Sequence, residues 1–208
     1  GILSGTPDTA GTSNFTVTAT DSNSDSGNRN YSLQIKDPGA CLFCDDFNDG
    51  TVDPNWTYVK GTWNESGGEL VGFHTRKADA IATPIFTGCS QCTVDTTVQI
   101  GNEIDARVSL IAWYVDKKNY VELILIPAKD KIVLKQRLNG AVILKTKAVT
   151  VIDPNTSYQI QLGFNGADFS VMLNGSPILT IPPAATPNGT VGFRVKKGTG
   201  RFDQISVN

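Results

Sequence analysis

The chain has 208 residues, of which 18% are charged, and its formal net charge is −2. This balance argues against a dedicated nucleic-acid-binding protein, and no apolar run approaches the ~18 residues that a membrane-spanning helix needs. Thr, Ser, Asn and Gly are abundant and alternate with short β-branched runs, a pattern that predicts strands and turns rather than helices. The length suits one all-β domain with a small appendage, in an exported protein.

The first predicted element is a β-hairpin within residues 1–36. Phe15–Thr20 and Tyr31–Lys36 both alternate apolar and polar residues, and a polar loop separates them. One face of the hairpin therefore carries several large apolar side chains. Two strands alone are marginally stable in water, and their free edges favour pairing with other strands. We expect the hairpin to pack on the rest of the chain or on a sheet of a neighbouring copy.

The sequence of this hairpin resembles a known repeat. The residues GILSGTPDTAGTSNFTVTATDSN and the later YSLQI are similar to the closing strands of bacterial Ig-like (cadherin-like) repeats of large surface proteins. Such repeats usually have further strands before the SGTP turn. The resemblance implies one of two origins for residues 1–36: the trimmed end of a larger secreted precursor, or a segment that pairs with another subunit.

Residues 37–42 are predicted to be a short linker, because Pro and Gly interrupt the strand pattern there. From residue 43 to residue 208, about a dozen short strands alternate with turns, several of them Asn-Gly pairs that are typical of hairpins. This organisation predicts an antiparallel two-sheet sandwich. The expected strands include the separate runs Glu69–His74, Ala80–Phe86, Gly189–Val195 and Arg201–Val207.

Three stretches of this second region are similar to a concanavalin A-like (laminin G-like) jelly-roll domain. They are CDDFNDGTVDPNWTYVKGTWNESGGELVG, RVSLIAWYVDKKNYVELIL and GTVGFRVKKGTGRFDQISV. The resemblance covers residues 43–208 and implies an all-β jelly roll whose first strand, at Asp46-Phe47, pairs near the last, Phe202–Val207. It leaves the function open, because such domains include lectins, carbohydrate-binding modules, glucanases and structural domains.

The four cysteines form two CxxC motifs, Cys41 to Cys44 and Cys89 to Cys92. Four thiolates can complete a zinc site, but the gap between these motifs is much longer than the usual gap of about 15–20 residues. Paired cysteines of exported proteins are normally oxidised, so we expect two disulfides. Extended i, i+3 cysteines lie ~10 Å apart, which is too far for a disulfide. Either each motif is a tight turn or the two motifs are linked to each other, and we favour the second arrangement.

The sequence offers little for catalysis. Glucanases of the jelly-roll fold carry a Glu-x-Asp-x-x-Glu motif, which supplies the two carboxylates that glycoside hydrolysis uses. Glu103 and Asp105 match the first half of that motif, but Val108 stands where the second glutamate belongs. The single histidine, His74, has no nucleophile motif around it. We therefore expect no enzymatic activity.

An acidic cluster is the candidate metal site. Asp46 and Asp49 lie at the first strand of the jelly roll, and Asp203 lies in the strand expected to adjoin it. Several carboxylate oxygens can hold Ca²⁺, and the resemblance implies that a structural calcium often occupies such a corner. The alternative is that these are turn residues that bond their own backbone.

The candidate ligand-binding residues come from alternation along the central strands. Arg107 shares a face with Trp113, Tyr120 with Glu122, and Lys135 with Arg137. If these faces meet on one sheet, they form with Arg76 a cationic and aromatic patch. Such a mixture suits sugars, because aromatic rings cover C–H faces and charged groups bond hydroxyls. The alternative is that Trp113 belongs to the core and the charges form a solvated sheet face.

The predicted function is a non-catalytic extracellular module of a bacterial surface protein, which binds a polysaccharide or other glycan or mediates adhesion. The alternative is a structural subunit of an extracellular fibre or surface assembly, in which residues 1–36 bind copies of the same chain by strand exchange. Neither function involves a nucleic acid or a membrane span, and the only cofactor expected is structural Ca²⁺.

Overall fold

The structure is a computed structural model that describes residues 11–35, 41–50, 55–103 and 105–208, without the side chains of residues 34–35 and 75–79. The chain divides into two compact units, Gly1–Cys41 and Leu42–Asn208. Within the described residues, no helix is long and apolar enough to cross a membrane.

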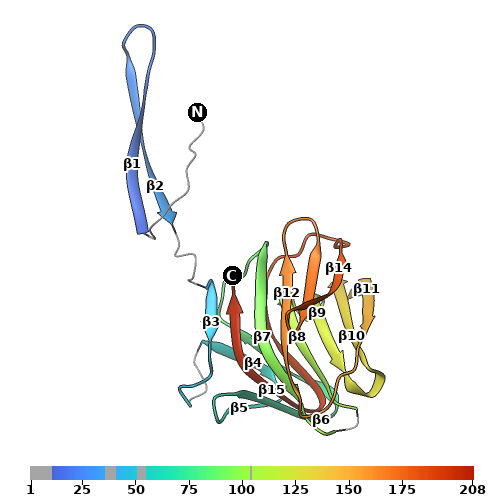
Figure 1. Cartoon of the computed structure of the whole chain (residues 1–208). Helices are drawn as coiled ribbons and strands as arrows, with labels where there is room; N and C mark the ends of the chain where they lie inside the picture. The colour runs from blue at the N-terminus through green and yellow to red at the C-terminus, as the bar shows by residue number, and fades with distance from the viewer. Residues whose placement is uncertain (1–10, 36–40, 51–54, 104) are drawn as a thin grey trace. The chain divides into compact units, whose positions relative to one another are not determined.

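The first unit contains an antiparallel hairpin of β1 (Gly11–Thr20) and β2 (Ser26–Ile35), which Figure 1 shows as a two-stranded ribbon. Phe15 lies opposite Tyr31, and their rings stack with centroids 5.7 Å apart. Val17, Tyr31 and Leu33 are 40–48% exposed. The predicted hairpin with one apolar face is therefore present, and its strands are longer than the alternation alone indicated.

The second unit is a sandwich of two antiparallel sheets, as predicted. Sheet I contains, in spatial order, β11 (Ala141–Val149), β10 (Lys131–Leu138), β9 (Asn119–Ile126), β8 (Arg107–Asp116), the first half of β15 (Thr190–Val207), the second half of β6 (Leu70–Pro84) and β4 (Trp56–Lys60). Sheet II contains β14 (Ser176–Ile181), β13 (Phe169–Leu173), β12 (Ser157–Phe164), β7 (Cys92–Ile100), the second half of β15, the first half of β6 and β5 (Thr62–Glu65). A short 3₁₀ turn, η1 (Pro127–Lys129), connects β9 to β10.

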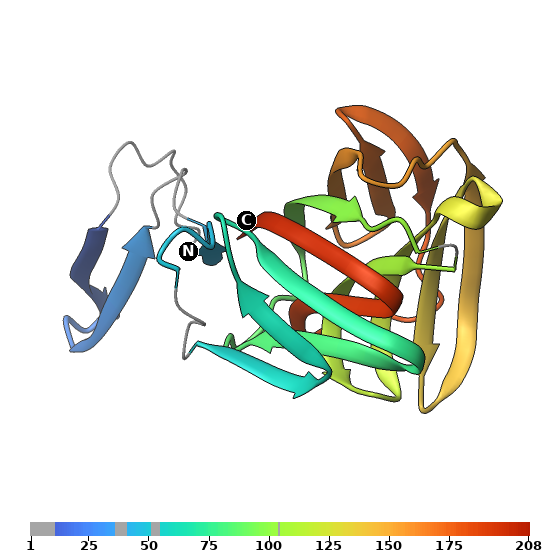
Figure 2. The same cartoon turned by 90° about the horizontal axis from the view of Figure 1, so that it is seen from below.

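Two long strands pass from one sheet to the other. β15 pairs with β8 through residues 190–196 and with β7 through residues 200–207, while β6 runs beside both halves (Figure 2). The expectation of separate strands in these two regions was therefore wrong. Glycine allows β15 to continue across the layers at this point, since a Cβ on Gly200 would lie 2.6 Å from Val195 Cγ2.

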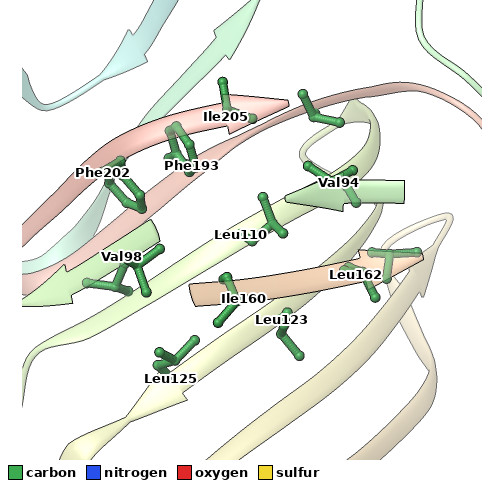
Figure 3. Packing of buried hydrophobic residues seen from close by; sticks show 14 of the residues in the cluster. Val94, Val98, Leu110, Leu123, Leu125, Ile160, Leu162, Phe193, Phe202 and Ile205 are labelled. Carbon is green, nitrogen blue, oxygen red and sulfur yellow. The ribbon is translucent and has the colours of Figure 1, made fainter. Parts of the chain in front are cut away.

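The core lies between the two sheets and is almost entirely aliphatic and aromatic. β7 alternates strictly between buried and half-buried residues, which places Val94 and Val98 inside. Figure 3 shows these valines near Leu110 of β8 and the aromatic rings of β15. Phe193 and Phe202, from the two halves of β15, stack with ring centroids 3.8 Å apart. β15 thus contributes to the core from both sheets.

The termini of the jelly roll close against each other, as the resemblance implied. β3 (Phe43–Asp45) pairs with residues 205–207 of β15, and the Leu42 N–H donates to the Val207 carbonyl at 2.6 Å.

The disulfide arrangement differs from the one favoured on sequence grounds. Cys89 is bonded to Cys92, with Cα atoms 6.1 Å apart. Cys41 and Cys44 are disulfide-bonded as well. A bend at Ser90-Gln91 brings the ends of the second motif within reach, so this motif is a tight turn and the expected cross-link between the two motifs is wrong. Oxidised cysteines cannot serve as thiolate ligands, which also removes the zinc alternative.

Candidate functional site

The candidate site lies on the outer face of sheet I, the face turned away from the core. Paired residues of adjacent strands share a face. Lys135 of β10 pairs with Glu122 of β9, and Arg107 of β8 pairs with Lys196 of β15. Register therefore gathers charged residues from four neighbouring strands, while the residues between them, such as Val108 and Leu123, point into the core.

Glu122 is the centre of this face. Its side chain is 3% exposed, and it accepts hydrogen bonds at Oε1 from Ser109 Oγ at 2.9 Å and from Arg194 Nη1 at 3.1 Å. Lys135 Nζ forms an ion pair with Oε2. Burial works to raise the pKa of Glu122, but Arg194 and Lys135 outweigh it and hold the pKa below its ordinary value of 4.5. Glu122 is therefore a buried carboxylate that holds two cations in place.

The ring of Tyr120 contacts three cations of this face, two of which also contact Glu122. Its ring is 6% exposed, and Arg194 Cζ, Lys135 Nζ and Arg137 Cζ lie 5.3, 5.5 and 6.0 Å from its centroid. Arg194 Nη1 also donates to the Tyr120 hydroxyl at 3.2 Å. These distances are typical of cation–π contacts. Tyr120 is thus a platform for cations and offers little open ring surface.

Trp113 does not lie on this face, so its predicted place beside Arg107 was wrong. The pairing of β8 with β9 is irregular after Ala112, and Trp113 has a φ of 50°. This bulge turns the indole into the core, where it packs 5.4 Å from Phe169 and 6.1 Å from Phe164, measured between ring centroids. The alternative assignment of Trp113 to the core was correct.

The bulge also brings Tyr114 to the outer face. Its ring lies 6.3 Å from that of Tyr120, and it packs against a small apolar cluster that includes Ile81 and Ile111. Burial is the main cause that raises the pKa of Tyr114. Strict alternation along β8 assigned Tyr114 to the opposite face, and nothing in the sequence marks the bulge.

Two depressions adjoin the outer face. One encloses about 80 Å³ and is lined by Arg107, Ser109, Glu122, Ile124, Lys135, Arg194 and Lys196. The other encloses about 140 Å³ at the ends of β8, β9 and β10. Its lining includes Tyr120, Arg137 and residues 185–188, and also the buried residues Trp113, Val121 and Gln136. The structure thus brings together five of the predicted ligand-binding residues, Arg107, Tyr120, Glu122, Lys135 and Arg137. The Arg76 side chain lies outside the described residues.

Sequence reasoning missed Arg194 and Lys196, which line the smaller depression. A usable signal was present. In β15 the apolar residues Val191, Phe193 and Val195 are buried, so alternation places Arg194 and Lys196 together on the opposite face.

The partial glucanase motif does not assemble a catalytic pair. Glu103 accepts a hydrogen bond from Thr199 Oγ1 at 2.7 Å, and Asp105 forms an ion pair with Lys197 at 3.0 Å. The Lys197 ammonium lowers the pKa of Asp105. Val108 is fully buried and faces the core. His74 is half-buried in β6.

The predicted calcium ligands are not gathered into one site. In the parts of the chain that the structure describes, no three His, Cys, Asp or Glu side chains are placed to hold a metal ion. Asp46 Oδ1 accepts a hydrogen bond from the Asn48 N–H at 3.2 Å, as the turn alternative expects. Asp49 has an interaction partner, and Asp203 is exposed. Calcium binding stays an untested prediction.

Comparisons with known proteins agree with this architecture. The family model described as "Putative Ig domain" matches residues 1–36, as the sequence resemblance implied. No curated protein sequence matches the chain.

Solved structures match the jelly roll. The carbohydrate-binding module CBM66 from Bacillus subtilis is 21% identical, with a TM-score of 0.65 over 74% of this chain and 95% of that one. A β-glucanase from Bacillus licheniformis is 10% identical, with a TM-score of 0.66 over 83% and 99%. A Bacillus subtilis protein of unknown function with a galectin-like fold is 13% identical, with a TM-score of 0.67 over 82% and 96%. At these identities the matches establish the fold, a concanavalin A-like and galectin-like jelly roll.

The core position of Trp113 predicts a large effect on stability. Replacing Trp113 by Ala should lower the free energy of unfolding by about 3–5 kcal/mol, because a buried aromatic ring leaves a cavity. Val115→Ala, two residues along the same strand at a side chain that is 62% exposed, should change it by less than about 0.5 kcal/mol. Chemical denaturation of both variants measures the difference, and equal stabilities would contradict the assignment.

The pairing of Glu122 predicts a loss of stability in acid. Because the folded-state pKa of Glu122 lies below its ordinary value, the stabilisation is complete above pH ~5 and is lost as the pH falls through the folded-state pKa. Glu122→Gln should destabilise the protein by about 3 kcal/mol at pH 7, since two buried cations lose their counter-charge. The variant should also lose less stability between pH 6 and pH 3 than the wild type.

Urea denaturation across this pH range checks the expectation. Asp203→Asn, which alters an exposed carboxylate, serves as the control and should follow the wild-type curve. A Glu122→Gln curve parallel to that of the wild type would show that Glu122 does not contribute to the acid sensitivity.

Proposed function

We propose that residues 42–208 form a non-catalytic carbohydrate-binding domain of an extracellular bacterial surface protein, and that the outer face of sheet I is its binding surface. The observation that carries the proposal is the cluster around Glu122 and Tyr120. It holds Lys135, Arg137 and Arg194 at fixed positions beside two depressions. Polar and cationic groups held at fixed positions suit the hydroxyl and charged groups of a sugar.

The structural neighbours support the same function. One of them is named as a carbohydrate-binding module, and another has a galectin-like fold. Fold similarity alone does not assign a function, so the proposal depends on the residues of the outer face. Disulfides suit an oxidising, extracellular location, and an adhesive role on the cell surface is consistent with glycan binding.

The chemistry of the site favours binding over hydrolysis. Glycosidases generally use two carboxyl groups between about 5 and 9.5 Å apart, one of which acts as an acid with a raised pKa. Among the described side chains that line the smaller depression, Glu122 is the one carboxylate. Its pKa is lowered and both its oxygens are engaged by Ser109, Arg194 and Lys135. This arrangement suits a structural counter-ion better than a proton donor.

A second candidate function comes from the hairpin. Its apolar face exposes Val17, Tyr31 and Leu33, and burial of each such side chain contributes roughly 1.5–3 kcal/mol. Strand addition to another copy would bury this face and satisfy the open edges of β1 and β2. The chain would then be a structural subunit of an extracellular fibre or surface assembly.

Loss of one cation from the outer face should weaken glycan retention. Arg137→Ala should reduce retention on a glycan array at least tenfold, because Arg137 lines the larger depression, while the thermal midpoint stays nearly unchanged. Arg201→Ala is the matched control, since Arg201 is also half-exposed but lies in the sheet II half of β15. A wild-type chain that binds no glycan would overturn the proposed function, and an Arg137→Ala variant that binds normally would overturn the location of the site.

Deletion of residues 1–36 distinguishes the two candidate functions. The jelly roll should remain folded, because it is a compact unit of its own. Sedimentation velocity should show that only the full chain self-associates if the hairpin mediates assembly. Val17→Lys with Leu33→Lys in the full chain should abolish the same association without removing the hairpin. A full chain that is monomeric at high concentration would refute the subunit function.

A further inference from the structure

The outer face of sheet I carries far more positive charge than the chain as a whole. The chain has a net charge of −2, yet alternation and register place eight basic residues on this face. The basic residues are Arg107, Lys131, Lys135, Arg137, Lys145, Lys147, Arg194 and Lys196. Among the described side chains that line the smaller depression, Glu122 is the one acid.

Glu122 contacts two of these cations, Lys135 and Arg194, but like charges also face each other across strands. Lys135 lies directly opposite Lys145 on the neighbouring strand, and Arg107 lies directly opposite Lys196. Like charges in such cross-strand pairs destabilise a sheet. The pKa of Lys131 is lowered by desolvation and then by the cations of Lys129 and Lys147. Repulsion between these like charges disfavours part of the arrangement, and a bound anion would relieve it.

The size of the smaller depression limits what can enter it. A volume of about 80 Å³ is well below the roughly 300–1,000 Å³ of sites that enclose a whole small molecule. A single substituent such as a carboxylate or a sulfate group fits this volume better than a sugar ring. Arg107, Lys135 and Arg194 line it, and cations of this kind form strong, charge-assisted hydrogen bonds with oxyanions.

The cations also extend well beyond the depression. Strands β15, β8, β9, β10 and β11 are neighbours in this order, so the charges from Lys196 to Lys145 span four strand spacings, roughly 19 Å. A ligand with one charge would use a small part of this width. A polymer with repeated negative groups would meet cations on several strands.

We propose that the outer face of sheet I binds an acidic polysaccharide, one that carries carboxylate or sulfate groups along its chain. This inference rests on the proposed carbohydrate-binding function and specifies its ligand class. One oxyanion enters the depression between Arg107, Lys135 and Arg194, and further negative groups lie over Lys145 and Lys147. Glu122 supplies the fixed counter-charge that keeps the empty site assembled.

A nucleic acid is the competing polyanion, and the face is poorly suited to it. Proteins that bind single strands stack bases on exposed aromatic rings. Tyr120, the ring at the centre of this face, is 6% exposed and covered by three cations.

Binding of the full chain to matched probes tests the inference. Polygalacturonate and its fully methyl-esterified form share a backbone and differ in charge, and dextran sulfate and dextran make the second pair. We expect affinity gel electrophoresis to show retention by at least one charged probe and weak or no retention by its neutral partner. Retention by polygalacturonate would show that the depression binds a carboxylate, and retention by dextran sulfate would show that it binds a sulfate. Raising NaCl from 50 to 300 mM should weaken the retention, because salt screens charge.

Substitution of the edge-strand lysines locates the interaction. Lys145→Gln with Lys147→Gln should weaken binding of the charged probe roughly 3- to 30-fold, since each exposed ion pair contributes about 0.3–1 kcal/mol. Both residues are exposed on β11, so the fold should be retained, with a thermal midpoint equal to or slightly above that of the wild type because the like-charge pair of Lys135 and Lys145 is removed. Arg201→Gln, in the sheet II half of β15, is the matched control and should bind like the wild type.

The outcomes separate this inference from the proposed function. The wild type could bind neutral glycans as well as it binds the charged probes, and Arg137→Ala could abolish this binding. That result would overturn the inference and leave the carbohydrate-binding function intact. Failure to bind any glycan, charged or neutral, would overturn both. Tighter binding to single-stranded DNA than to either charged polysaccharide, with the same sensitivity to Lys145 and Lys147, would assign the face to nucleic acid instead.

Discussion

The continuous course of β15 through both sheets is the constraint on which the rest of the jelly roll depends. Its two halves pair with β8 and β7, and the stacked rings of Phe193 and Phe202 join the layers through the core. The side chains between these core residues point outward, so the same strand that closes the core presents Arg194 to the outer face. Core packing and the candidate site are therefore fixed by one piece of backbone.

The site itself is organised by a buried charge. A carboxylate removed from water is costly unless cations and hydrogen bonds compensate it, and Glu122 receives both, from Ser109, Lys135 and Arg194. These contacts also restrict the side chains of Lys135 and Arg194 to positions beside the depression. Less conformational entropy is then lost when a ligand binds. Pre-organisation of this kind gives affinity to a shallow surface that could not enclose its ligand.

The sequence predicted most of the fold because the period of two is a direct consequence of strand geometry. The hairpin, the sandwich and the shared face of Tyr120, Glu122, Lys135 and Arg137 all follow from alternation. The same rule failed at Trp113, because the bulge in β8 adds a residue without any marker in the sequence. It was not applied to Arg194, although the buried residues Val191, Phe193 and Val195 alternate with it along the strand.

The cysteine pairing failed for a different reason. Two cysteines can form a disulfide only if the backbone between them brings their Cα atoms close enough. The bend at Ser90-Gln91 does this for Cys89 and Cys92, but those two residue types do not indicate a bend. Local chemistry fixes which residues alternate, whereas a bulge or a bend arises from packing between distant strands. Positions that depend on such packing are the ones that a single sequence does not reveal.

The two ends of the jelly roll lie side by side, and this affects where such a domain can be inserted into other proteins. Leu42 and Val207 are hydrogen-bonded neighbours, so the unit enters and leaves its fold at one edge. A domain whose ends lie together can be inserted into a surface loop of a host protein while the host's own strands keep their spacing. It also tolerates circular permutation, because a short bridge between these ends preserves every strand pairing.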